Sequence, residues 1–384
     1  MSEHISKRID DLFELKQGKY CEAEKISEIR TNEAPFAHYG ANGVTGYVAE
    51  KMYEVRLPLI SCRGANCGVI HFSQEESWIN NNSIACIPKE GCDPTFFYHQ
   101  FKRFDFADVI SGAAQPQITL SNLRHKQFWA PPLPTQRSIA AILSAYDDLI
   151  ENNRRRIHLL EESARQLYRE WFVHLRFPGH QHTPIHNGIP EGWSRKTLRE
   201  LSESVRYGFT ASATREPDGP RFLRITDIVP SVINWETVPY CPISEKDFPK
   251  FELQTGDIVV ARTGATVGFA KRIGKLNQPA VFASYLVRLR LDGIDDLIGG
   301  IFAESDEFKS YIRNNAGGAA QPNANAQVIA GAELLVPTLT IQKLFRETVE
   351  PTVQSRDILQ QQIQKLAKAR DHLLPKLMSG EIAV

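Results

Sequence analysis

The residue types best suited to contacting another molecule lie in two glycine-rich segments. RGANCG occupies residues 63–68 and RTGATVG occupies residues 262–268, each directly after an apolar run. Glycine lets backbone N–H groups approach a phosphate closely, and arginine can bind guanine or phosphate. A tight hairpin whose arginine forms a surface ion pair explains the same spacing, so both interpretations stay open. The candidate side chains are Arg63, Asn66, Arg262, Thr263 and Thr266.

Two further polar turns offer amide side chains. One is NNNS at 80–83, and the other is the pentapeptide GAAQP, which occurs at 112–116 and again at 318–322. Glutamine and asparagine can form paired hydrogen bonds with adenine. A purely structural turn explains both stretches equally well. The candidate residues in these turns are Asn81, Asn82, Gln115 and Gln321.

Signatures of a catalytic site are missing from the sequence. An adenine methyltransferase needs an Asn/Asp-Pro-Pro-aromatic tetrapeptide, whereas the one Pro-Pro pair, Pro131-Pro132, follows an alanine. No Walker sequence for ATP binding is present. The Asp/Glu-x-Lys tripeptide of many nucleases occurs only at 14–16 and 307–309. The second lies in an expected helix, where residues two apart point away from each other. The sequence therefore predicts a non-catalytic chain.

The cysteines and histidines are poorly spaced for a metal site. The only cysteine cluster comprises Cys62, Cys67, Cys86 and Cys92. It lacks the Cys-x2-Cys pair that zinc sites favour. The histidine group, at 180, 182 and 186, lies in a linker rich in proline and glycine at 178–192. We therefore expect reduced thiols, solvated histidines, and no metal or other cofactor in this chain.

The balance of charge restricts the class of protein. Lys+Arg and Asp+Glu both number 45, so the formal net charge is zero. A protein that binds nucleic acid on its own is usually basic, so neutrality weighs against strong non-specific binding. Local clusters or a basic partner would have to supply attraction to phosphate. The charged N-terminal stretch and the absence of a long apolar run predict a soluble, cytoplasmic protein without membrane association.

An internal repeat organises the chain. The two GAAQP segments lie 206 residues apart, and the same shift places Gln136 on Gln342 and Arg137 on Lys343. A shift of 200 superimposes the two glycine-rich segments. A single shared pentapeptide can arise by chance, but several matches at one shift arise by chance much less often. The sequence therefore predicts two copies of one unit, each a mixed domain followed by a long helix.

Two long helices are the clearest expected elements. After Thr135, a suitable N-cap, apolar residues recur in steps of three and four as far as Trp171, except that Asn153 occupies a core-spaced position. A second stripe runs from Ile341 to Leu377, and Pro351 inside it predicts a kink or a restart. Each stripe is too long to be buried on one small domain. We therefore expect the two helices to pack on each other.

The segments before each helix have the pattern of short strands. Apolar runs at 55–62, 83–87, 256–261 and 284–291 alternate with glycine, proline and asparagine turns. Short helices are expected at 95–108 and 304–314. The predicted fold class is α+β, with two mixed, β-rich domains and two long antiparallel coiled-coil helices related by a pseudo-two-fold repeat. The expected boundaries are 1–135, 136–178, 179–340 and 341–384.

These motifs resemble those of the DNA-specificity subunits of type I restriction-modification systems. One common type of target-recognition domain is similar to the stretch from YGANG (39–43) through RGANCG to Trp78 and NNS (81–83). Another is similar to YGFTASA (207–213), FLRITDI (222–228), GDIVVARTGATVG (256–268) and SYLVRLR (284–290). The segment PPLPTQRSIAAIL (131–143) resembles the entry to the first spacer helix. Together the matches cover nearly the whole chain in the order of the family.

The resemblance implies a subunit that addresses double-stranded DNA and leaves the chemistry to others. Its two target-recognition domains would recognise a bipartite, asymmetric site, and the helices would hold them apart. Two modification (methyltransferase) subunits would dock on it, and a restriction/translocase subunit would cut DNA. S-adenosylmethionine, ATP and Mg would belong to those partners. The motifs of the second domain add Tyr207, Thr210 and Arg224 to the candidate DNA contacts.

Three other interpretations stay open at this level. One is the specificity subunit of a related system whose partner fuses methyltransferase and nuclease. Another is a coiled-coil scaffold whose globular ends bind proteins. The third is a metal-dependent nuclease. A genome-neighbourhood check, a sequence-specific footprint and a cleavage assay would separate these classes.

Overall fold

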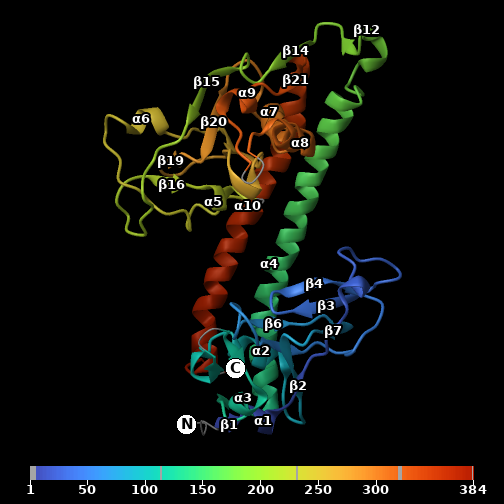
Figure 1. Ribbon diagram of the computed structural model, residues 1–384, viewed down its shortest axis with the longest axis vertical. Helices are drawn as coiled ribbons and strands as arrows, with labels where there is room; N and C mark the ends of the chain where they lie inside the picture. The colour runs from blue at the N-terminus through green and yellow to red at the C-terminus, as the bar shows by residue number, and fades with distance from the viewer. Residues whose placement is uncertain (1–5, 113–114, 231, 319–321, 383) are drawn as a thin grey trace. The chain divides into compact units, whose positions relative to one another are not determined.

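The computed structural model describes residues 6–112, 115–230, 232–318, 322–382 and 384. The chain divides into two compact units, Met1–Asn152 with Gln362–Val384, and Asn153–Gln361. Two long helices, α4 (Leu133–Tyr168) and α10 (Leu339–Met378), contribute to both units and pack antiparallel (Figure 1). Each unit therefore contains a β-rich domain and one part of each long helix, which confirms the predicted fold class.

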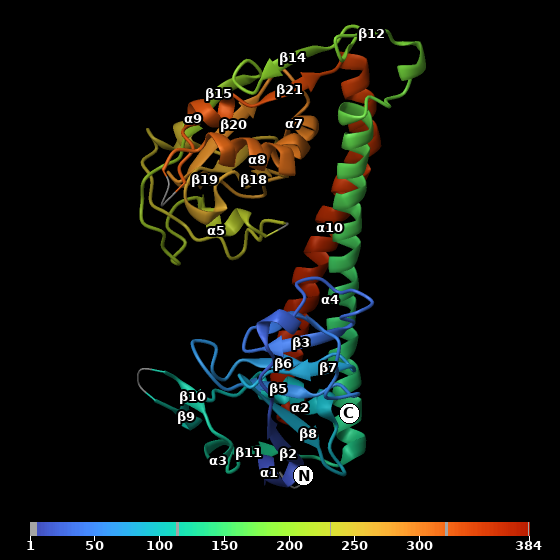
Figure 2. The ribbon, with the colours of Figure 1, turned by 45° about the vertical axis from the view of Figure 1, so that its right-hand side comes forward.

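The domain of the first unit is built on two small sheets (Figure 2). An antiparallel sheet has the order β2 (Phe13–Gln17), β8 (Ser83–Pro88), β5 (Pro58–Ser61), β6 (Ile70–Phe72). The other has the order β4 (Gly43–Val48), β3 (Phe36–Gly40), β7 (Ser77–Ile79), in which β3 and β7 are parallel. Two short pairs complete it: β1 (Ser6–Arg8) with β11 (Gln127–Trp129), and β9 (Ile110–Ser111) with β10 (Gln117–Ile118).

Short helices cover the first domain. They are α1 (Ile9–Leu12), α2 (Pro94–Phe101) and α3 (Leu120–Leu123), with 3₁₀ turns at Ala23–Lys25 and Ala107–Val109. Asp93 caps α2 by accepting a hydrogen bond from the backbone N–H of Phe96 at 2.9 Å. The expected helix at 95–108 is therefore wrong in its second half, because α2 ends at Phe101.

The domain of the second unit repeats this plan. Its antiparallel sheet has the order β15 (Ser202–Tyr207), β20 (Leu286–Leu291), β17 (Ile258–Ala261), β18 (Ala270–Arg272). A parallel pair joins β16 (Arg221–Leu223) to β19 (Ala280–Phe282). The remaining pairs are β14 (Ser194–Thr197) with β21 (Glu333–Val336), and β12 (Ile185–His186) with β13 (Ile189–Pro190). The same strand order in both units gives the sequence repeat a structural counterpart.

Five short helices belong to the second domain. They are α5 (Ile225–Ile228), α6 (Phe248–Phe251), α7 (Asp296–Ala303), α8 (Asp306–Asn315) and α9 (Ala326–Ala330), and a 3₁₀ turn lies at Gly264–Thr266. The expected helix at 304–314 corresponds to α8. Helix α7 was not predicted, because its sequence DLIGGIFA is apolar on nearly every side and lacks the one-sided pattern of a surface helix.

The long helices follow the predicted apolar stripes but differ at their ends. Helix α4 begins at Leu133, so Thr135 is not its N-cap, and a π-helical turn at Arg169–Val173 follows it. Helix α10 continues through Pro351 without a restart. Asn153 is buried, as its core-spaced position predicted, with 6% of its surface exposed. Within the described residues, no helix has the length and hydropathy needed to cross a bilayer.

Each unit has its own core between the domain and the helix segments. In the first unit, Leu143 of α4 and Leu377 of α10 join the apolar core of the domain, and Arg370 of α10 pairs with Asp147 of α4 at 2.5 Å. In the second unit, the ring of Phe345 on α10 lies 4.8 Å from that of Phe172. These contacts bury apolar surface on the domain-facing side of both helices.

A buried glutamine joins each long helix to the domain that precedes it. Gln136 accepts a hydrogen bond from the backbone N–H of Asp93 at 2.8 Å and donates to the Pro131 carbonyl at 2.7 Å. Gln342 accepts from the N–H of Asp295 at 2.8 Å and donates to the Pro337 carbonyl at 2.9 Å. Asp93 and Asp295 cap α2 and α7, so the two joints are the same in both units.

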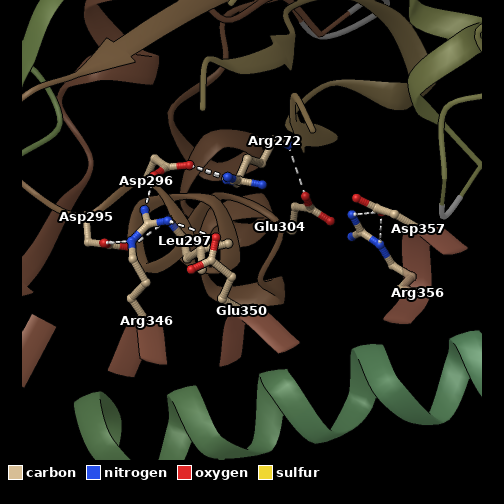
Figure 3. Close-up of polar contacts among 9 residues, drawn as sticks. All are labelled: Arg272, Asp295, Asp296, Leu297, Glu304, Arg346, Glu350, Arg356 and Asp357. Atoms are coloured by element: carbon tan, nitrogen blue, oxygen red, sulfur yellow. Dashed lines mark hydrogen bonds and ion pairs between the residues drawn. The ribbon is translucent and has the colours of Figure 1, made fainter. Parts of the chain in front are cut away.

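The second joint carries additional ion pairs. Arg346 of α10 pairs with Asp295 at 2.5 Å and also with Asp296, at the start of α7 (Figure 3). Arg272 of β18 donates to the same Asp296 at 2.5 Å. The position of Arg346 corresponds to Ala140 in the first unit, which is buried in the apolar core. The second domain is therefore held to its helix partly by charge.

Candidate nucleic-acid interface

The first glycine-rich segment forms a tight turn after β5. Gly64 and Gly68 have φ values of +78° and +89°, and the N–H of Cys67 donates to the Gly64 carbonyl at 3.1 Å. A Cβ at Gly68 would lie 3.2 Å from the Cβ of Phe106. Glycine is therefore required at position 68 by both the backbone angle and the packing.

The second segment forms the same turn after β17. Gly264 and Gly268 have φ values of +74° and +83°, and the N–H of Val267 donates to the Gly264 carbonyl at 3.1 Å. A Cβ at Gly268 would lie 3.2 Å from the Cβ of Ile312. Two segments that share a sequence pattern thus share backbone geometry and packing.

The segment that follows GAA in each repeat runs beside the glycine-rich turn. In the first unit, the N–H of Gly64 donates to the Pro116 carbonyl at 3.1 Å, and the N–H of Ile118 donates to the Cys62 carbonyl at 3.0 Å. In the second unit, the corresponding bonds join Gly264 to Pro322 at 3.0 Å and Ala324 to Arg262 at 2.8 Å. Two motifs that are distant in sequence therefore meet in each unit.

The turn before the strands β8 and β20 completes the arrangement. The N–H of Cys62 donates to the Asn82 carbonyl at 2.8 Å, and the N–H of Arg262 donates to the Tyr285 carbonyl at 3.1 Å. We name the three joined segments the first platform (61–69, 80–83 and 115–118) and the second platform (261–269, 283–286 and 322–324). The residue of the second unit that is equivalent to Arg63 is Thr263, and the residue of the first unit that is equivalent to Arg262 is Cys62. The two arginines therefore do not occupy equivalent positions.

The first platform presents mainly uncharged polar side chains. Asn66 donates to Asn42, and the Gln17 side chain donates to the Asn81 carbonyl at 2.8 Å. The exposed side chains of Arg63 and Gln115 form no hydrogen bond or ion pair within the described residues. Asn82 is half-buried. Burial raises the pKa of the neighbouring Cys62 thiol to about 11, so this cysteine stays protonated and unreactive at neutral pH.

The second platform holds one arginine against an aromatic ring. The guanidinium carbon of Arg262 lies 4.8 Å from the centre of the Tyr207 ring, and its Nη2 donates to Asn323 at 3.3 Å. The Tyr207 hydroxyl accepts a hydrogen bond from the N–H of Ala326 at 2.8 Å, which fixes the ring. Thr263 and Thr266 are half-buried beside it. This arrangement limits the motion of Arg262 before any ligand is bound.

Three other predicted residues have different surroundings. Arg224 forms two hydrogen bonds of 3.0 Å with Asp227 at the start of α5, so its guanidinium is already occupied. Thr210 is exposed in the segment after β15. Gln321 lies outside the described residues. Sequence reasoning did not find Tyr285, which a backbone hydrogen bond joins to Arg262, or Gln17, whose side chain donates to the Asn81 carbonyl.

Within the described part of the chain, no three His, Cys, Asp or Glu side chains gather as a metal site. Cys86 is fully buried, and burial raises the pKa of its thiol above the ordinary value, as it does for Cys62. His180 contacts the Phe177 carbonyl at 2.8 Å through Nδ1. The side chains around both platforms are suited to hydrogen bonding and stacking, which are the contacts that proteins make with nucleic-acid bases and phosphates.

Known proteins are similar to this chain in sequence. Residues 1–162 match the family "Type I restriction modification DNA specificity domain". The type I restriction enzyme MjaIX specificity subunit of Methanocaldococcus jannaschii is 25% identical over 338 residues, which cover 83% of this chain and 76% of that protein. The Escherichia coli EcoprrI specificity subunit is 24% identical over 143 residues, which cover 37% and 36% of the two chains.

A solved structure has the same fold. The type I restriction-modification S subunit from M. genitalium superimposes with a TM-score of 0.60 at 17% identity, covering 97% of this chain and 95% of that one. The family matched is one of DNA-specificity, non-catalytic subunits. The resemblance predicted from the sequence is thus confirmed: the chain is similar to the DNA-specificity subunits of type I restriction-modification systems, over 83% of its length for one such subunit.

Proposed function

We propose that this specificity subunit recognises a bipartite, asymmetric site in double-stranded DNA, one half-site with each platform. The observation that carries the proposal is that one backbone arrangement occurs twice with different side chains. A shared backbone would present both platforms to DNA in the same way, while different side chains would select different bases. The recognition domains are assigned to 1–135 and 179–340, with spacer helices at 136–178 and 341–384.

Two modification subunits are proposed to dock on the long helices. Leu149 and Leu159 of α4 and Ile358 of α10 are between 50% and 66% exposed, although each is large and apolar. Exposed apolar side chains on a helix provide surface for a protein partner. The partners would carry S-adenosylmethionine, while ATP and Mg would serve a restriction/translocase subunit. We place this assembly in the cytoplasm, where cellular DNA is accessible.

The net charge defines the experiment that tests this proposal. Because the chain is neutral, we expect weak binding to DNA by the purified subunit alone and much tighter binding once modification subunits are added. Selection from a random duplex library with the complex should return two short motifs separated by unselected base pairs. A single continuous motif would contradict the bipartite assignment. Methyl transfer by the purified subunit alone would contradict its non-catalytic role.

A further inference from the structure

The turn at 283–286 presents an aromatic side chain beside the second glycine-rich turn. Its backbone is fixed at both ends, because the N–H of Leu286 donates to the Ala283 carbonyl at 2.9 Å and the N–H of Arg262 donates to the Tyr285 carbonyl at 3.1 Å. Tyr285 is nevertheless 61% exposed. Its side chain forms no hydrogen bond, ion pair or ring contact within the described residues. The backbone of Tyr285 is thus held in place, while its phenol side chain has no partner within the described residues.

The equivalent position in the first unit is Asn82. Four backbone contacts establish this equivalence. Cys62 donates to Asn82 as Arg262 donates to Tyr285, and Gly18 donates to Ser83 at 3.0 Å as Gly208 donates to Leu286 at 3.2 Å. Gly18 and Gly208 have no room for a Cβ, which would lie 2.3 Å and 2.2 Å from backbone oxygens of the turns. Asn82 and Tyr285 therefore occupy equivalent backbone positions and differ in the chemistry of their side chains.

We propose that Tyr285 is a specificity-determining residue that contacts base edges in the second half-site. This inference rests on the proposed function of the second platform. The phenol hydroxyl can donate to or accept from a base, and the ring offers apolar surface to a thymine methyl group. Arg262, whose backbone N–H donates to the Tyr285 carbonyl, has its guanidinium held against the Tyr207 ring. Neighbouring aromatic and cationic groups on a fixed backbone suit contact with the edges of base pairs.

The test uses the complex of full chain and modification subunits, with a duplex library as the DNA. Tyr285→Ala should lower affinity for the preferred base at one or two positions of the second half-site by roughly 5- to 150-fold, and should leave the first half-site unchanged. Tyr285→Phe keeps the ring and the fold, and should lose only the part of the preference due to the hydroxyl. Asn82→Tyr should alter the first half-site alone. Ile185→Ala, an exposed apolar residue in the linker, is the control.

Each outcome decides the inference. Parental base preferences in both Tyr285 variants would overturn it while leaving the bipartite site intact. An equal loss of affinity for all bases would also overturn it, because Tyr285 would then contact phosphate. If Tyr285→Ala unfolds the second domain, the Tyr285→Phe preferences decide the question alone. A parent complex that selects one continuous motif would overturn the proposed function and this inference together.

Discussion

Arg63 and Arg262 differ in how the protein holds them, although both belong to glycine-rich turns. Arg262 is supported by the Tyr207 ring and by Asn323, whereas Arg63 is exposed and has no hydrogen bond within the described residues. A guanidinium with a fixed orientation suits a base edge, while a mobile one suits a phosphate. We therefore expect the two arginines to make different contacts with DNA.

Alanine substitutions test this difference. Arg262→Ala should relax one position of the second half-site by about 1–3 kcal/mol. Arg63→Ala should weaken binding to all sequences about equally and lower the salt dependence by roughly one phosphate contact. Quantitative binding to single-base variants at several salt concentrations measures both. Arg103→Ala, which removes another exposed arginine, serves as the control. Unchanged affinity in both folded variants would return these arginines to a structural role.

The sequence predicted part of the two platforms and missed the rest for a physical reason. Arg63, Asn66 and Arg262 lie in turns whose glycines are visible in the sequence. Tyr285 reaches its platform through the backbone N–H of Arg262, and Gln17 reaches the other through a side-chain hydrogen bond to the Asn81 carbonyl; both partners are more than 20 residues away. NNNS at 80–83 and ASYL at 283–286 have no identical residue at equivalent positions. Only the register of the strands shows that these turns correspond.

Among the helices, the periodic spacing of apolar residues predicted the two long ones. It failed for α7, because a helix that is buried on nearly every side has no periodic pattern. Helices α4 and α10 have one apolar side, so their stripes are visible in the sequence. Helix α7 packs so closely that a Cβ at Gly299 would lie 2.3 Å from the Leu291 side chain. Its pattern DLIGGIFA therefore has no polar side from which a helix could be predicted.

The glutamine joints are expected to contribute strongly to stability. Gln136→Leu and Gln342→Leu should each leave buried backbone groups of a helix cap without partners, at about 1–3 kcal/mol per group. The loss should appear as a lower free energy of unfolding in urea. Arg137→Ala and Lys343→Ala change the exposed neighbours at equivalent repeat positions and are the matched controls. A joint variant as stable as its control would show that the glutamine is not needed there.

At the level of the whole molecule, the long helices are proposed to set the spacing of the DNA site. One heptad inserted into each helix, near 157 and near 363, keeps both apolar stripes in phase. It adds roughly 10 Å, or about three base pairs of B-DNA. The preferred gap between half-sites should lengthen by about two to four base pairs, with reduced affinity because the domains also rotate around the DNA by about 100°.

Selection from a library of random spacer lengths measures this gap. Both half-site sequences should stay the same as in the parent. A folded insertion variant that still prefers the parental gap would show that the helices do not set the distance.

Each half of the chain is proposed to determine one half of the recognised site. The most direct measurement is genome-wide mapping of methylated adenines in cells that carry the system, with the parent chain and with residues 1–135 replaced by another recognition domain. We expect the parent to give two half-sites at a fixed gap, and the exchange to alter one half-site while the other and the gap stay unchanged. A joint change of both half-sites, or a methylated site without two parts, would contradict the account.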